Sequence, residues 1–145
     1  MIIESYEIFF DEVTGTDDQI MKLYALLKER VYSISHHKLP SYDQHIYFVK
    51  NNPYKIWYIV YNNNEELGSF YLKNDNSIGL NLKKNEKKIV MEILNFINMN
   101  LKPNLEIPSD IPPYFYLNIS PTNTELIRIF ESLGKQPIQV SYKTK

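Results

Sequence analysis

Three short apolar segments separated by tight polar turns constrain the fold of this chain more than any other feature. The segments are YKIWYIVY at residues 54–61, LGSFYLK at 67–73 and SIGLNL at 77–82. Aromatic and β-branched residues favour strands, and the intervening turns NNNEE and NDN are rich in residues that tolerate turn conformations. Because such short turns join neighbouring antiparallel strands, we predict a three-stranded meander.

A strand and two helices are expected before this meander. Residues 5–13 have the composition of a strand, and Thr16 is placed to cap a helix whose first turn is acidic. The apolar stripe of this helix consists of Ile20, Leu23, Tyr24, Leu27 and Val31. A second helix is expected to begin at Ser41, because Gln44 lies at capping-box spacing from it.

After the meander we expect a helix, a strand, a helix and a last strand. The first of these helices has one apolar side and ends before Pro103, where a proline-rich loop follows. A strand is predicted at residues 114–120, and Pro121 and Thr122 open the next helix, which Gly134 ends. Residues 137–143, PIQVSYK, are predicted to close the chain as a strand. This order predicts an α+β fold with a largely antiparallel sheet.

The composition limits the function classes. With 145 residues and an apolar fraction of 43%, the chain fits one domain over residues 1–145. Its net charge of −1 and mixed charge pattern provide no broad positive surface for nucleic acid. No apolar run approaches the roughly 20 residues of a membrane span, and Glu4 stands where a signal peptide has positive charge. We therefore expect a cytoplasmic protein that binds neither nucleic acid nor membrane.

No metal site is expected from this sequence. The chain has no cysteine, which excludes disulfides and thiolate zinc ligands. His36 and His37 are adjacent, so their side chains diverge on a helix or a strand and are poorly placed to share a metal ion. His45 remains open to two interpretations, as a structural residue or as part of a pocket for the acceptor substrate.

The C-terminal third, NISPTNTELIRIFESLGKQPIQVSY, resembles the closing pattern of the GNAT superfamily of acetyl-CoA-dependent N-acetyltransferases. The matching residues are Asn118, Pro121, Asn123, Leu126, Phe130, Leu133 and Gly134. The resemblance extends over about residues 39–142. It implies the GNAT fold, with a mixed, largely antiparallel sheet flanked by helices on both faces. It also implies transfer of an acetyl group from acetyl-CoA to a small primary amine, such as an amino sugar or another metabolite.

The resemblance also implies which residues contact the coenzyme. These are Leu80 and Leu82 through their backbone at the pantetheine arm, Lys87 and Lys88 at the phosphates, and Asn123 and Phe130 beside the arm. In many members of the family the position of Phe130 holds a tyrosine that protonates the leaving thiolate, which phenylalanine cannot do. Water or another tyrosine would then have to supply the proton.

The strand predicted at residues 114–120 offers candidate catalytic side chains. Tyr114, Tyr116 and Asn118 alternate on one of its faces. If this face meets the cleft, Tyr116 is the first candidate for the missing acid, and Asn118 offers an amide to the substrates. If it faces solvent or a partner, these residues are an amphipathic surface.

The segment NEKKIVMEIL departs most from the family. Members of the family carry glycines in the loop before the central helix, because bare backbone can approach the coenzyme pyrophosphate at the helix N-terminus. Here Glu86, Lys88 and Val90 stand at the glycine positions, so we interpret this loop as a degenerate pyrophosphate loop. The nearby lysines either bind the phosphates through their side chains or are simply solvated.

Two functions therefore stay open. The first is an acetyl-CoA-dependent N-acyltransferase with a small-molecule amine as its partner. The second is a binding or interaction module that keeps the GNAT fold but has lost acetyl-CoA binding and catalysis. The sequence leaves the assembly state open, a homodimer included.

Overall fold

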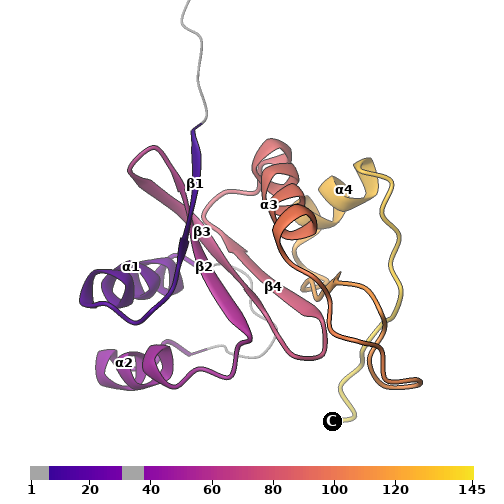
Figure 1. Ribbon diagram of the computed structural model, residues 1–145, viewed down its shortest axis with the longest axis horizontal. Coiled ribbons are helices and arrows are strands. Elements are labelled where there is room, and N and C mark those ends of the chain that lie inside the picture. The colour runs from indigo at the N-terminus through magenta and orange to yellow at the C-terminus, as the bar shows by residue number, and fades with distance from the viewer. Residues whose placement is uncertain (1–6, 31–37) are drawn as a thin grey trace, which may run out of the picture.

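The computed structural model describes residues 7–30 and 38–145, and its strands form one sheet in the order β1-β2-β3-β4-β5 (Figure 1). Strands β1 (Ile8–Glu12), β2 (Ile56–Asn62), β3 (Glu65–Leu72) and β4 (Ser77–Leu82) pair antiparallel in turn. Strand β5 (Tyr116–Leu117) pairs parallel with β4. The predicted meander is confirmed as β2, β3 and β4, and the α+β class is confirmed with it.

Helices cover both faces of this sheet, as expected. Helices α1 (Asp17–Lys28) and α2 (Tyr42–Lys50) lie on one side, and α3 (Lys87–Asn100) and α4 (Thr124–Ser132) lie on the other (Figure 1). None of the helices that the structure describes is both long and apolar enough to cross a membrane.

The alternation of side chains along the strands determines which face packs on which helices. Trp57, Ile59 and Tyr61 of β2 belong to a buried cluster with apolar residues of α1 and α2. The other cluster joins the sheet to α3 and consists of Val60, Phe70, Leu72, Ile78, Ile89, Ile93 and Ile97. Two apolar cores therefore hold the sheet between its helices.

The starts of α1 and α2 follow the predicted capping boxes. The Thr16 hydroxyl accepts from the Gln19 N–H over 3.2 Å, and the Ser41 hydroxyl accepts from the Gln44 N–H over 3.2 Å. In each helix the glutamine side chain accepts in return from the backbone N–H of the capping residue. Each box satisfies N–H groups that a helix start leaves without partners.

The C-terminal part corrects several boundaries. Residues 137–143 do not form the expected strand: Ile138, Val140 and Tyr142 are 57%, 73% and 86% exposed. Their alternating pattern suits a strand, but among the described residues no neighbouring strand pairs with them, and a strand needs such pairing. The strand expected at 114–120 is reduced to β5, because the chain leaves β4 after Leu117.

Helix α4 begins later than predicted. Its capping residue is Asn123, whose Oδ1 accepts from the Leu126 N–H over 3.3 Å, so Thr122 lies outside the helix. The expected first strand is shortened to β1, and the start of that prediction, Ser5, falls outside the described residues. The same holds for Val31 of the predicted helical stripe and for Glu4, His36 and His37.

Candidate functional site

The edge of β4 that faces β5 is only partly paired. The register couples Ser77 to Tyr116 and Ile78 to Leu117, and β5 then ends. Within residues 7–30 and 38–145, no strand pairs with residues 79–82 on this side. Strands β4 and β5 thus separate directly after Ile78.

The backbone of Leu80 and Leu82 points toward this unpaired edge. The Lys83 N–H donates to the Leu67 carbonyl over 2.9 Å, which fixes the odd-numbered positions of β4 as the ones that hydrogen-bond to β3. Neighbouring residues of an antiparallel strand alternate in the direction of their N–H and C=O groups. The peptide groups of the even-numbered Leu80 and Leu82 are therefore directed away from β3, toward the opening.

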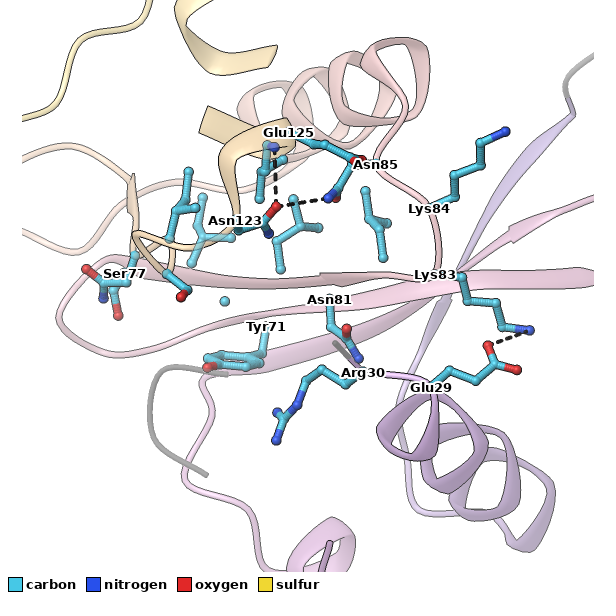
Figure 2. A pocket seen from close by; sticks show the side chains of 18 of the residues that line it. Glu29, Arg30, Tyr71, Ser77, Asn81, Lys83, Lys84, Asn85, Asn123 and Glu125 are labelled. Atoms are coloured by element: carbon cyan, nitrogen blue, oxygen red, sulfur yellow. Dashed lines mark hydrogen bonds and ion pairs between the residues drawn. The ribbon is translucent and has the colours of Figure 1, made fainter. Parts of the chain in front are cut away.

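A cavity of about 320 Å³ lies at this opening. Strand β4 contributes Leu80, Asn81 and Leu82, while the segment after β5 contributes Asn118 and Ser120. Other lining residues come from the end of α1, from β3, from the loop before α3 and from the start of α4. Figure 2 shows that these residues approach the strand from two sides, Asn85 and Asn123 on one and Tyr71 and Arg30 on the other.

The α4 side of the cavity is held by a pair of asparagines. Asn85 Nδ2 donates to Asn123 Oδ1 over 3.0 Å, and the same oxygen caps α4 (Figure 2). Asn123 is buried, and its backbone N–H donates to the Ser120 carbonyl over 2.9 Å. These bonds fix the loop before α3 against the start of α4.

The opposite side is formed by a tyrosine that lies across a glycine. Tyr71 of β3 is the register partner of Gly79, and a Cβ at Gly79 would lie 2.0 Å from Tyr71 Cζ and 2.4 Å from its hydroxyl oxygen. Only glycine permits this close approach. The Tyr71 ring also stacks on Tyr54, with centroids 3.8 Å apart and an interplanar angle of 3°. The Tyr71 hydroxyl is thereby placed beside the point where β4 and β5 separate.

The Tyr54 phenol of this stack is held in its neutral form. Burial, followed by the neighbouring Tyr71, raises the pKa of Tyr54 well above its ordinary value, so the Tyr54 phenol stays protonated at neutral pH. Arg30 lies close enough to oppose part of this rise in the pKa. The Tyr71 ring, which lines the cavity, thus stacks on a neutral phenol, and the Arg30 guanidinium lies on the same side of the cavity.

Several charged side chains also reach the cavity. Lys83 Nζ lies 3.8 Å from a carboxylate oxygen of Glu29 and 3.6 Å from one of Glu66. Lys84 lies 3.7 Å from Glu86, but 82% of its side chain is exposed. The charge of Lys83 is therefore shared between two carboxylates, whereas Lys84 remains accessible from solvent.

The cavity brings together some of the residues expected from the sequence. Those that line it are Leu80, Leu82, Asn118 and Asn123. Those that do not line it are Tyr116, Lys87, Lys88 and Phe130. Lys87 and Lys88 are exposed on the first turn of α3, and Phe130 is half-buried on α4. Val90, at one of the expected glycine positions, is fully buried in the protein.

Tyr116 interacts at the other end of β4. Burial and the neighbouring Asp75 carboxylate raise the pKa of the Tyr116 phenol. Burial alone would raise the pKa of Asp75 as well, but the hydrogen bonds from Ser77, the charge of Lys73 and the hydrogen bond from Tyr116 together lower this pKa. The Tyr116 hydroxyl thus faces the Asp75 carboxylate and the Ser77 hydroxyl, and of these three residues only Ser77 lines the cavity.

His45 is a buried residue of the α1–α2 layer. Its Nε2 donates to the Ile20 carbonyl over 2.9 Å, and its ring contacts those of Tyr24 and Tyr42, which also contact each other. Among the described residues, no three histidine, aspartate or glutamate side chains gather in an arrangement that could hold a metal ion. His45 thus takes the structural alternative that the sequence left open.

The sequence did not single out three residues of the cavity, Tyr71, Asn81 and Arg30. Gly79 was the available signal, since a glycine inside a strand often marks a close approach of another group. The sequence did not identify Tyr71, the register partner of Gly79, as the group that approaches this glycine. Arg30 reaches the site only through the packing of α1, which no local pattern specifies.

Comparison with known proteins agrees on the fold. No protein-family model and no curated protein match the chain. Among solved structures, Campylobacter jejuni N-acetyltransferase PseH is similar over 92% of this chain and 91% of its own, with a TM-score of 0.61 and 14% identity. Aminoglycoside N-acetyltransferase AAC(6')-Iy in complex with CoA covers 100% of this chain and 99% of its own, with a TM-score of 0.59 and 11% identity.

A third similar structure is the dodecameric spermidine N-acetyltransferase from Vibrio cholerae. It covers 88% of this chain and 78% of its own, with a TM-score of 0.53 and 14% identity. The chain therefore has the fold of these N-acetyltransferases, the GNAT fold expected from its closing segment.

Proposed function

We propose that the chain is an acetyl-CoA-dependent N-acyltransferase that acts on a small primary amine. The observation that carries this proposal is the unpaired edge at Leu80 and Leu82, which opens onto a cavity in a sheet of GNAT topology. Acetyl-CoA would supply an acetyl group on an activated thioester. The free peptide groups of β4 suit its pantetheine arm, because that arm contains amides that can pair with a strand edge.

The loop before α3 supports a phosphate site that differs from the glycine-rich loop of the family. Helix α3 begins directly after Glu86, and the N-terminal end of a helix favours anions. Exposed Lys84, Lys87 and Lys88 add positive charge around this end. We propose that these lysines bind the phosphates in place of the close backbone approach that glycines would allow.

We propose Tyr71 as the proton donor, because Phe130 has no hydroxyl and cannot donate a proton. The Tyr71 hydroxyl lies beside Gly79, where β4 and β5 separate, and it lines the cavity. As the amine nitrogen bonds to the acetyl carbon and the carbon–sulfur bond breaks, this phenol would protonate the leaving sulfur. Solvent would return the proton to Tyr71 and take the one released by the amine. Asn118, which also lines the cavity, would orient the substrates through its amide.

The decisive experiment measures thermal unfolding with and without acetyl-CoA. Binding at about 100 times the dissociation constant stabilises a protein by roughly 2.7 kcal/mol, which shifts the Tm by several degrees for a chain of this size. In Asn118→Trp, a bulky ring would fill the cavity and abolish the shift. Asn98→Trp on the exposed side of α3 is the matched control and should retain it.

A GNAT-fold binding module is the second candidate function. The absence of glycine from residues 83–90 and the pairing of Lys83 with two carboxylates favour it. This function predicts that acetyl-CoA shifts the Tm of neither the wild type nor Asn118→Trp. That result would contradict the acyltransferase proposal and direct the search to other ligands of the cavity.

A further inference from the structure

We infer that the amine accepted at this site carries an anionic group, a carboxylate or a phosphate, which binds the guanidinium of Arg30. The inference rests on the proposed acyltransferase function and specifies its acceptor. It follows from the distribution of charge on the Tyr71 side of the cavity, which is opposite the asparagine pair (Figure 2).

Arg30 is a part-buried cation that lines the cavity at the end of α1. Figure 2 shows its side chain on the same side of β4 as Tyr71 and Asn81. In the part of the chain that the structure describes, no carboxylate forms an ion pair with it. A part-buried guanidinium is most favourable when an anion accepts its hydrogen bonds, so a ligand is well placed to supply that anion.

Two acidic groups of this region have other partners, and Glu125, which also lines the cavity, lies on the opposite side of β4 from Arg30 (Figure 2). Glu29, the residue before Arg30, pairs with Lys83 over 3.8 Å, and Lys83 also contacts Glu66. Asp75 accepts hydrogen bonds from the Ser77 N–H and hydroxyl over 2.9 Å and 2.6 Å. Neither carboxylate is positioned by these contacts to neutralise Arg30.

The Tyr54 phenol cannot supply a negative charge either. Arg30 opposes only part of the rise in the Tyr54 pKa, so this phenol remains protonated at neutral pH. The stacked rings of Tyr54 and Tyr71 present a partly apolar wall beside the cation. Water is reduced next to such a wall, so an ionic contact there is stronger than on an open surface.

The positions of Gly79 and Arg30 orient the acceptor. Under the proposed function, the acetyl group would meet the amine where β4 and β5 separate, next to Gly79 and the Tyr71 hydroxyl. The amine nitrogen then lies at Tyr71, and the remainder of the acceptor extends toward Arg30. Polycations such as polyamines and aminoglycosides would place positive charge beside Arg30, and the repulsion disfavours them.

The test compares matched amines that differ by one anionic group. Glucosamine 6-phosphate against glucosamine tests the phosphate, and lysine against cadaverine tests the carboxylate. Release of free CoA thiol reports turnover, and the chain itself gives no thiol background because it has no cysteine. We expect kcat/KM to be about ten- to a hundredfold higher for the anionic member of at least one pair, as for a hydrogen-bonded charge contact.

Substitutions test whether Arg30 causes the preference for the anionic amine. Arg30→Gln should remove the preference for the anionic amine, and Arg30→Lys should restore part of it. Lys28→Gln removes a nearby positive charge of α1 that does not line the cavity, and it should keep the preference. The preference should also fall as salt is raised, because ions screen the contact.

The outcomes separate this inference from the proposed function. If the uncharged or cationic member of each pair is acetylated as well or better, the inference is wrong while the acyltransferase function stands. If no amine is turned over, calorimetric titration of glucosamine 6-phosphate and of lysine decides. If the wild type binds either compound and Arg30→Gln does not, the result supports the anion site but not the acyltransferase function. If the wild type binds neither compound, the inference of an anion site is wrong.

Discussion

The side-chain amide of Asn85 donates a hydrogen bond to Oδ1 of Asn123 over 3.0 Å and thereby joins the loop before α3 to the start of α4. The same oxygen accepts from the Leu126 N–H over 3.3 Å. One buried side chain thus caps a helix and closes one wall of the cavity. Two segments that are far apart in sequence depend on a single acceptor atom.

Replacing Asn123 should therefore destabilise the protein more than replacing Asn85. We expect Asn123→Ala to lower the free energy of unfolding by about 1–3 kcal/mol, since it removes a helix cap and leaves the Asn85 amide without its acceptor. Asn123→Asp keeps the accepting oxygen and should lose less. Urea denaturation measures both, and equal losses for the two variants would contradict the role of this oxygen.

The hydroxyl of Tyr71 can be tested by a substitution that removes a single oxygen. If it protonates the leaving sulfur, Tyr71→Phe should lower kcat by about a hundredfold and leave the affinity for acetyl-CoA unchanged. Tyr114→Phe is the control, because Tyr114 is exposed and does not line the cavity. Steady-state kinetics that show an undiminished kcat for Tyr71→Phe would exclude this proton donor.

Gly79 should tolerate no side chain while Tyr71 covers it. A Cβ at residue 79 would lie 2.0 Å from the Tyr71 ring, so Gly79→Ala must displace the ring and its stack on Tyr54. We expect a loss of about 1–3 kcal/mol in the free energy of unfolding, typical of overpacking. In a Tyr71→Ala background the same substitution should cost much less. A double-mutant cycle measures this coupling, and additive effects would show that the ring is not the obstacle.

The parts of the fold that the sequence predicted correctly are those encoded locally. The alternation around Trp57 and the tight turns specify the meander, and Thr16 and Ser41 specify two helix starts. These signals depend on neighbouring residues alone. The helices were therefore assigned to segments that differ from the structure mainly at their ends.

The remaining features depend on contacts between distant segments. Thr122 and Asn123 are both acceptable caps by type, and the bond from Asn85 accompanies the choice of Asn123. The early end of β5 creates the cavity, yet it is decided by where the chain leaves β4. Tyr71 and Arg30 likewise reach the site only when sheet and helix are assembled.

Buried His45 should make stability depend on pH. Burial lowers the pKa of His45 from its ordinary value of 6.5, against the smaller opposing effect of its bond to the Ile20 carbonyl. The unfolded chain then binds a proton that the folded state resists, so stability should decrease as the pH falls below about 6.5. Urea unfolding at pH 7.5 and 5.5 measures this slope.

Two variants test whether the pH dependence of stability arises from His45. His45→Gln has no titrating ring and should flatten the dependence, whatever its effect on stability at pH 7.5. A chain in which both His36 and His37 are changed to Gln should keep it. If the double variant loses the slope and His45→Gln retains it, the effect arises elsewhere in the chain.

The last segment of the chain should contribute little to the stability of the folded protein. Residues 137–145 lie outside the described sheet, and Ile138, Val140 and Tyr142 expose most of their surface. Side chains that bury so little area gain little from the hydrophobic effect. A chain that ends at residue 136 should therefore unfold within about 0.5 kcal/mol of the full chain in urea. A loss of several kcal/mol would instead mean that this strand-like segment pairs with a sheet edge in solution, as its alternating apolar pattern allows.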